Sequence, residues 1–362
     1  MAEKYMKTIQ FETGGDTYHP LPMIGGNGKS WIQSNITSHS FDSICYGNGL
    51  WVAGGNDVFG AQYGLYYSND GKSWTQSNVT SYSFNSIYYS NGLWVAGGNG
   101  LWYSTDGKSW TQSNMTVTSG TFKSIYYGNG LWVACSNNGI YYSTDGMTWS
   151  QSNITSFFVL VYYANGLWVA GSNSNGIYYS TDGMTWTQSD VTDRYLYSFY
   201  YANGLWVAGS NDGLYHSTDG KDWAGSNIAN GYFTSVYYAN GLWIACGAGS
   251  NSKGLLYSTD GDTWTQSNIT SGIFKLVHYA NGLWIAGGNN GIYYSTDGKS
   301  WTQSNLNSGT FNSVYYANGI WITGSGNNNG LYYSEVTEGK ILQVVNGEWA
   351  MVAVPNAEEV AY

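Results

Sequence analysis

The tetrapeptide Asn-Gly-[Leu/Ile]-Trp occurs eight times in this chain of 362 residues and constrains its fold more than any other feature. A second motif, Gly-x-x-Trp, occurs once per unit, and seven of its eight copies follow Ser-[Thr/Asn]-Asp. The tetrapeptide tryptophans, at intervals of 36 to 43 residues, are Trp51, Trp94, Trp132, Trp168, Trp206, Trp243, Trp284 and Trp321. The chain is therefore a tandem repeat of one unit of about 38 residues with two marker turns.

Each unit contains four short runs rich in β-branched and aromatic residues, of which FNSVYY, LWVAG, GIYYS and WTQS are examples. Gly, Asn or Asp bounds each run, as expected of strands joined by tight turns. A four-stranded unit of this period cannot bury both of its faces without neighbours. The sequence thus predicts an all-β fold, an eight-bladed β-propeller of four-stranded antiparallel blades that spans residues 31–334.

The two ends of the repeat region predict how the ring closes. The last unit, Phe311 to Ser334, lacks a fourth strand, whereas an extra copy of that strand, Trp31 to Ser34, precedes the first complete unit. We expect the N-terminal strand to complete the last blade, which leaves no free sheet edge in the ring. Residues 1–30 then form an N-terminal attachment arm and residues 335–362 a C-terminal tail. In the tail, ILQVV-NG-EWAMVAV is typical of a β-hairpin with a type I′ turn at Asn346–Gly347.

Composition and charge argue against several classes of protein. Only 9% of the residues are charged, the net charge is −10, and no stretch concentrates basic residues, so we expect no nucleic-acid partner. The first residues lack the apolar segment of a signal peptide, and no apolar run is long enough to cross a membrane. We expect Cys45, Cys135 and Cys246 to be free and buried, because the last two occupy equivalent positions in units beyond disulfide reach.

The second motif has its most regular copies in STDGKSW, at Ser104–Trp110 and again at Ser295–Trp301. It resembles the Asp-box of bacterial neuraminidase repeat propellers, which joins the third and fourth strands of a blade, although here one residue fewer separates Asp from Gly. The resemblance covers residues 31–334 in seven copies. It implies a structural turn in which Ser and Asp accept backbone N–H groups, Gly takes a positive φ and Trp packs between blades. The aspartates with this structural role are Asp70, Asp106, Asp145, Asp182, Asp219, Asp260 and Asp297.

Asp-box propellers include sialidases and other glycosidases, but this chain lacks the residues that their chemistry needs. Sialidases hold the substrate carboxylate with three arginines, and this chain has only Arg194. Other glycosidases need two converging carboxylates, yet seven of the fifteen Asp belong to the boxes and all seven Glu lie outside the repeats or at their end. We therefore expect no enzyme, no catalytic residues and no cofactor. The four histidines show no ligand spacing and each box offers one carboxylate, so we expect no metal.

The eight units differ mainly in two of their four connections. The turns between strands 1 and 2 and between strands 3 and 4 are nearly constant, whereas the 2–3 and 4–1 connections vary in length and sequence. In a propeller the two variable connections lie on one face, and loops on a rigid scaffold usually carry recognition. Drift in unconstrained loops is the alternative explanation. If this face binds a ligand, the candidates are Phe59 and Tyr63 in the longest 2–3 loop, Lys123 and Lys275 at the start of strand 1, and Arg194 and Tyr197 in the most divergent 4–1 connection.

The segments outside the repeats, residues 1–22 and 339–359, are similar to short terminal sequences of virion structural proteins from bacteriophages of gut bacteria. The resemblance implies that the termini attach the propeller to other virion proteins, or to copies of the same chain. We predict a non-catalytic, tail- or fibre-associated virion component, made in the host cytoplasm, whose variable face binds a bacterial surface receptor, a glycan, without membrane insertion. A purely structural decoration protein and a divergent glycan-active hydrolase are the alternatives.

Overall fold

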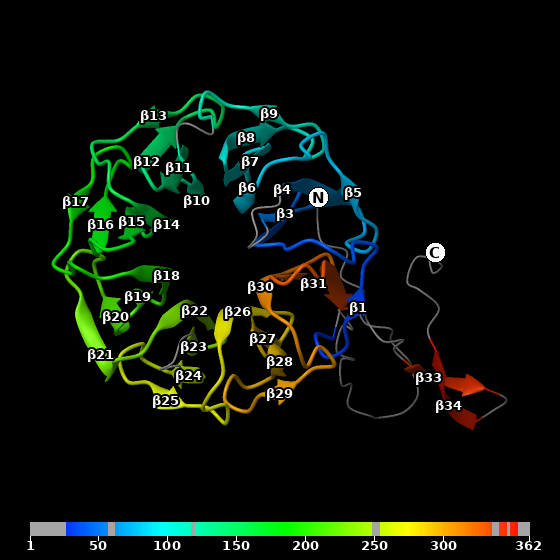
Figure 1. Cartoon of the computed structure of the whole chain (residues 1–362). Helices are drawn as coiled ribbons and strands as arrows, with labels where there is room; N and C mark the ends of the chain where they lie inside the picture. Colours follow the sequence, from blue (N-terminus) through cyan, green and yellow to red (C-terminus); the bar gives the residue numbers. More distant parts are fainter. Residues whose placement is uncertain are drawn as a thin grey trace, which may run out of the picture. The chain divides into compact units, whose positions relative to one another are not determined.

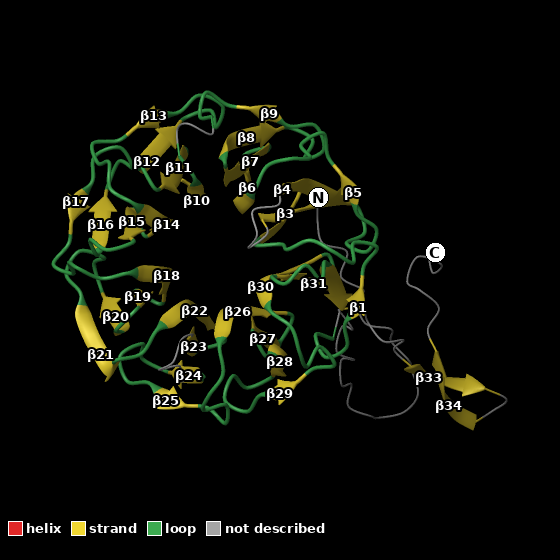
Figure 2. Ribbon diagram, viewed as in Figure 1, coloured by secondary structure: helices red, strands yellow, loops and turns green. Residues whose placement is uncertain are grey.

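The computed structural model describes residues 27–56, 62–116, 120–247, 254–334, 340–345 and 348–353. All regular elements in these residues are β-strands, and eight four-stranded antiparallel sheets follow one another around a ring (Figures 1 and 2). The eight-bladed β-propeller that the repeats predict is therefore confirmed. None of the described residues belongs to a helix that could cross a membrane.

Seven blades are built from four consecutive strands each. Within a blade, strand 1 lies nearest the axis and strand 4 is the outermost. Blade 1 contains β2 (Ser43–Gly47), β3 (Leu50–Asn56), β4 (Gln62–Ser68) and β5 (Thr75–Gln76), and blade 2 contains β6 (Phe84–Ser90), β7 (Leu93–Gly98), β8 (Gly100–Ser104) and β9 (Thr111–Gln112). Blade 3 contains β10 (Phe122–Gly128), β11 (Leu131–Ser136), β12 (Gly139–Ser143) and β13 (Ser150–Gln151), and blade 4 contains β14 (Phe158–Ala164), β15 (Leu167–Ser172), β16 (Ile177–Ser180) and β17 (Thr187–Gln188). Blade 5 contains β18 (Leu196–Ala202), β19 (Leu205–Ser210), β20 (Gly213–Ser217) and β21 (Ala224–Ala229), and blade 6 contains β22 (Phe233–Ala239), β23 (Leu242–Gly247), β24 (Leu255–Ser258) and β25 (Thr265–Gln266). Blade 7 contains β26 (Phe274–Ala280), β27 (Leu283–Gly288), β28 (Gly291–Ser295) and β29 (Thr302–Gln303).

Blade 8 joins the two ends of the repeat region. It contains β30 (Phe311–Ala317), β31 (Ile320–Ser325) and β32 (Leu331–Ser334), and its outer strand is β1 (Ile32–Gln33). The register places Ile32 opposite Tyr333 and Gln33 opposite Tyr332. The N-terminal strand thus completes the last blade, as the sequence predicts.

The Asn-Gly turns join strand 1 to strand 2 of each blade in the type I′ conformation. In blade 2, Asn91 and Gly92 have φ values of 50° and 77°, which Asn and Gly adopt at low cost. The resulting register places Tyr89 opposite Trp94. Seven blades also carry a β-bulge at the start of strand 1, so that one additional residue lies there unpaired.

The hydrophobic core lies between adjacent blades. Strand 2 is buried along its whole length in most blades, as the sequence LWVAGG of β7 shows. In one cluster, Val52 of blade 1 packs with Phe84, Ile87 and Trp94 of blade 2. Each large aromatic removes roughly 150–250 Å² from water, and because every blade packs in this way on its neighbour, a blade cannot keep its core without the ring.

The C-terminal part of the chain contains a separate unit. β33 (Lys340–Val345) and β34 (Glu348–Ala353) pair in antiparallel register, with Val345 opposite Glu348. These strands match the hairpin that the sequence predicts, while its turn, Asn346–Gly347, and the N-terminal arm up to residue 26 lie outside the described residues. In the propeller, Cys45, Cys135 and Cys246 are free and buried, as expected.

Candidate binding face and seam pocket

The turn between strands 3 and 4 has the same hydrogen bonds in all seven copies of Ser-x-Asp-Gly. In blade 2, Asp106 Oδ1 accepts the backbone N–H groups of Lys108 at 2.8 Å and Ser109 at 2.7 Å, and Ser104 Oγ accepts the N–H of Gly107 at 2.8 Å. Equivalent contacts to the Ser300 N–H lower the pKa of Asp297 to about 2. Each aspartate is thus engaged within its own turn.

An asparagine that follows the outer strand connects each blade to the next. Asn78 Oδ1 accepts the backbone N–H of Trp110 at 2.8 Å, and its Nδ2 donates to the carbonyl of the same tryptophan at 2.9 Å. Seven seams between blades have this bridge, through Asn35, Asn78, Asn114, Asn153, Asn227, Asn268 and Asn305. In the seam between blades 4 and 5, the equivalent residue is Asp190.

The 2–3 turns and the 4–1 connections lie side by side, as expected of one face. In blade 2 the N–H of Asn99, in the 2–3 turn, donates to the carbonyl of Ser83, in the 4–1 connection, at 3.1 Å. The same contact joins Asn211 to Tyr195 in blade 5, also at 3.1 Å. We call the side formed by these two sets of connections the variable face.

The predicted binding residues are spread over four blades. Tyr63 is the second residue of β4 in blade 1, and Phe59 lies outside the described residues. Arg194 lies between β17 and β18, at the seam of blades 4 and 5. The remaining three, Lys123, Lys275 and Tyr197, occupy the bulge at the start of strand 1 in blades 3, 7 and 5.

These bulge residues, together with the equivalent Asp42, form a set around the axis that we call the bulge ring: Asp42, Asn85, Lys123, Val159, Tyr197, Thr234, Lys275 and Asn312. Lys275 Nζ donates to Asn312 Oδ1 at 2.9 Å, and Asn312 Nδ2 donates to Asp42 Oδ1 at 2.7 Å, which links three consecutive blades. Burial lowers the pKa of Lys123 and of Lys275, while the charge of Asp42 opposes this shift. Two cations and one anion therefore share the axial end of the variable face.

A second set of side chains, which we call the girdle, lies further along the inner strands and was not singled out from the sequence. It consists of Cys45, Tyr88, Tyr126, Tyr162, Tyr200, Tyr237, His278 and Tyr315, which occupy the same register position in the eight blades. The side-chain rings of neighbouring blades contact one another. Their centroids are 5.0 Å apart for Tyr88 and Tyr126 and 4.9 Å apart for Tyr237 and His278. Burial lowers the pKa of His278 to about 4 and raises that of Tyr315 to about 12. The recurrent first Tyr of each Tyr-Tyr pair was the sequence signal for this girdle.

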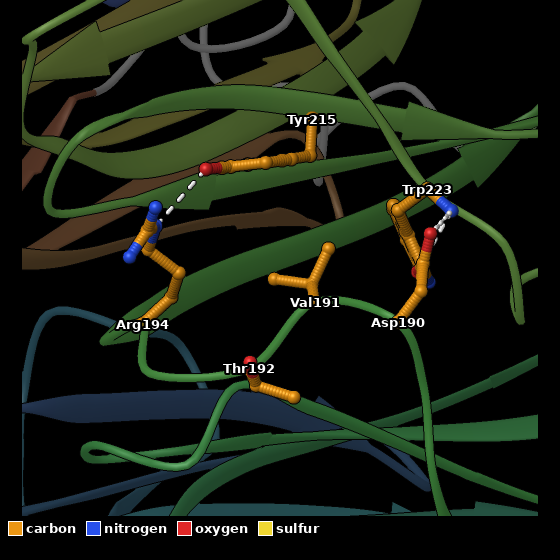
Figure 3. A pocket seen from close by; sticks show the side chains of 6 residues that line it. All are labelled: Asp190, Val191, Thr192, Arg194, Tyr215 and Trp223. Carbon is orange, nitrogen blue, oxygen red and sulfur yellow. Dashed lines mark hydrogen bonds between the residues drawn. The ribbon is translucent and has the colours of Figure 1, made fainter.

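A shallow pocket of about 290 Å³ lies at the seam of blades 4 and 5 (Figure 3). Arg194 Nε donates to the hydroxyl of Tyr215 at 3.1 Å and forms an ion pair with Asp212. The pocket is lined by Asp190, Val191, Thr192, Arg194, Tyr215 and Trp223. Of these residues the sequence predicted only Arg194, although Gln-Ser-Asp in place of Gln-Ser-Asn already marks this seam. The described residues contain no cluster of His, Cys, Asp or Glu that could hold a metal ion.

Comparisons with known proteins support the class that this architecture defines, an eight-bladed β-propeller. The computationally designed protein Ika8 has a TM-score of 0.67 at 9% sequence identity, over 85% of this chain and 100% of its own. YCF48, solved with a D1 peptide bound, has a TM-score of 0.51 at 15% identity, over 88% of this chain and 99% of its own. An ancestral GH74 enzyme has a TM-score of 0.55 at 14% identity, over 84% of this chain and 54% of its own, so this chain spans about half of that enzyme.

Comparison of the sequence with known proteins does not place the chain in a particular propeller family. No protein-family model matches the chain, and no curated protein is similar to it in sequence. At identities of 9 to 15%, the structural similarities support the propeller fold alone.

Proposed function

We propose that this chain is a non-catalytic component of a bacteriophage virion, tail- or fibre-associated, whose variable face binds a glycan of the bacterial surface. The attachment to a virion rests on the terminal segments, and the structural role of the Ser-x-Asp-Gly turns on their resemblance to the Asp-box. The ligand-binding role rests on the geometry of the two faces.

The observation that carries the proposal is the variety of side chains at one fixed backbone position. The bulge ring contains six residue types in eight equivalent places, whereas the position just before it is Phe in seven blades and Leu196 in the eighth. The Ser-x-Asp-Gly turns, by contrast, keep their hydrogen bonds in every copy. Since the fold accepts any of these residues at the bulge, the choice among them is free to serve recognition.

The side chains of the variable face are of the kinds that bind sugars. The rings of Tyr197 and Tyr232 lie 4.5 Å apart by their centroids, and such rings can stack on the apolar face of a pyranose. Beside these tyrosines, the other residues of the bulge ring offer amide, hydroxyl and ammonium groups, which can bind the hydroxyls and carboxylates of a glycan. Asp42 is the single acid in the bulge ring, and one carboxylate does not provide the acid and base pair of a glycosidase.

Retention on envelope glycans tests this function. Purified protein is incubated with immobilised polysaccharides from a panel of gut bacteria, and the bound protein and the glycan chain length are measured. We expect retention without shortening of the chains. Shortened chains would show that the protein is a hydrolase and not only a binding protein. Absence of retention on the envelope glycan of the phage host would leave structural decoration as the function.

A further inference from the structure

Blade 5 differs from the other seven blades at several contacts that converge on one seam. Seven of the eight Gly-x-x-Trp indoles donate through Nε1 to the carbonyl of the glycine three residues before, at 3.0 to 3.1 Å. The eighth, Trp223, is 7% exposed, and its Nε1 has no hydrogen-bond partner among the described residues. A buried N–H without a partner costs free energy, and this distinguishes the indole of blade 5 from the other seven.

The core around Trp223 also differs from that of the other blades. Phe199 occupies the position that is Ile or Val in the other seven blades, and its ring centroid lies 5.9 Å from that of Trp223. Leu196 stands where the other blades have Phe, so a smaller residue compensates for the larger one. Leu196, Phe199 and Trp223 pack in one hydrophobic cluster.

The outer strand of blade 5 leaves space beside the pocket. In the other seven blades a Gln of the outer strand lies opposite the residue of strand 3 that is equivalent to Tyr215, as Gln188 does opposite Tyr178. In blade 5 this partner is Gly225, opposite Tyr215. A Cβ added to Gly225 would meet no atom within 4 Å. The missing side chain thus leaves Tyr215, which lines the pocket, open on this side.

The charges in the pocket distinguish between ligand classes. Arg194 is paired with Asp212, whereas the carboxylate of the exposed Asp190 contacts only the backbone N–H of Trp223 among the described residues, at 3.1 and 3.3 Å. A carboxylate accepts hydrogen bonds from hydroxyls and repels another anion. The hydroxyls of Tyr215 and Thr192 supply further polar groups, and the pocket volume is at the lower end for ligand sites.

We infer that the seam between blades 4 and 5 is a binding site for one uncharged hexose residue. Asp190 accepts the sugar hydroxyls, and Tyr215, Thr192 and the indole of Trp223 border the sugar ring. This inference rests on the proposed glycan-binding function and names the sugar class and the subsite. Three departures from the repeat (Asp190, Phe199 and Gly225) and the unpartnered indole of Trp223 meet here, which independent drift in eight equivalent blades does not explain.

Nuclear magnetic resonance of the indole N–H groups tests the site directly. The Trp223 signal is assigned with Trp223→Phe, and the intact protein is titrated with methyl α-D-glucopyranoside, methyl α-D-galactopyranoside, methyl α-D-mannopyranoside, N-acetylglucosamine and, as an acidic probe, glucuronate. We expect at least one of the four neutral sugars to shift the Trp223 signal, and glucuronate to leave it in place. If no neutral sugar moves this signal, or glucuronate moves it as much, the inference is wrong.

Three variants make the test independent of folding. Gly225→Gln restores the side chain of the other blades and is expected to abolish the shift at an unchanged melting temperature. Asp190→Asn restores the common seam bridge and is expected to weaken binding by at least about tenfold. Asn153→Asp makes the converse change at the neighbouring seam and is expected to leave the affinity unchanged. Unaltered sugar binding by both Gly225→Gln and Asp190→Asn would also overturn the inference.

The outcomes separate the subsite from the proposed function. If the neutral sugars fail while the protein still binds host envelope glycans, the subsite is wrong and the proposed function stands. If the sugars bind at Trp223 and the protein does not bind host envelopes, the subsite stands and the proposed function is wrong.

Discussion

Asn305 holds Trp31 across the closure of the ring, accepting its backbone N–H at 2.8 Å and donating to its carbonyl at 2.9 Å. These two residues are 274 positions apart in the chain, yet their contact has the geometry of the other asparagine seams. The last seam is therefore closed by the same device as those formed by consecutive units.

Deleting residues 1–35 is expected to remove this contact and the outer strand β1, and to expose the edge of β32 (Leu331–Ser334). An unpaired strand edge invites association with other chains. We expect aggregation or a large fall in the melting temperature, measured by light scattering and calorimetry. Deletion of residues 1–26 alone retains Trp31 and β1 and should melt like the full chain. Equal melting of both deletions would contradict closure by this strand.

Replacing Asp182 by Ala is expected to destabilise the propeller by about 1–2 kcal/mol, because the N–H groups of Met184 and Thr185 lose their acceptor and turn partly to water. Denaturant unfolding measures the change. Asp222→Ala, at an exposed position of the next blade's turn, is the control and should alter stability little. A loss of glycan binding by Asp182→Ala at full stability would assign the turn to the ligand site.

As the pH falls, protonation of His278 is expected to destabilise the propeller at a higher pH than protonation of the aspartates in the Ser-x-Asp-Gly turns. Burial lowers the pKa of His278 to about 4, below its unfolded value of about 6.5, so the folded state resists protonation. The stability that the neutral imidazole of His278 contributes is present above pH 6.5 and is lost as the pH falls toward 4. His278→Tyr, which restores the commonest girdle residue, should remove this part of the pH dependence. Parallel stability profiles of the two proteins between pH 7 and pH 4 would show that His278 does not contribute.

Deleting residues 339–362 is expected to release a folded, monomeric propeller from virions or oligomers. The propeller unit ends before this segment. Incorporation into particles is measured by electrophoresis of purified virions, and folding by circular dichroism. Normal incorporation of the truncated chain would place the attachment elsewhere.

Much of the fold follows from the sequence because each turn has its own chemistry. Asn-Gly at the 1–2 turns requires positive φ at both residues, as Asn91 and Gly92 show, and the fixed period then sets the blades. The missing strand after Ser334 and the extra one at Trp31 predict closure by simple counting.

The site could be predicted only in part. Arg194 stands out as the single arginine, but the pocket beside it depends on where the Trp223 indole lies and on the gap at Gly225. These depend on side-chain packing between Phe199 and Trp223, which repeat spacing does not determine. The bulge ring could be aligned from the sequence, whereas the hydrogen bonds that link Lys275 to Asp42 through Asn312 could not.

The most direct test of the account compares the affinity of two double variants for the envelope glycan of the host. Lys123→Ala with Lys275→Ala removes both cations of the bulge ring, and Lys108→Ala with Lys299→Ala removes two lysines beside the Ser-x-Asp-Gly turns. The dissociation constants are measured by surface plasmon resonance, after calorimetry has shown matched melting. We expect the first pair to weaken binding by about tenfold or more, because a few anchors usually carry most of the binding energy, and the second to leave it unchanged. Weaker binding by the second pair alone would contradict recognition by the variable face.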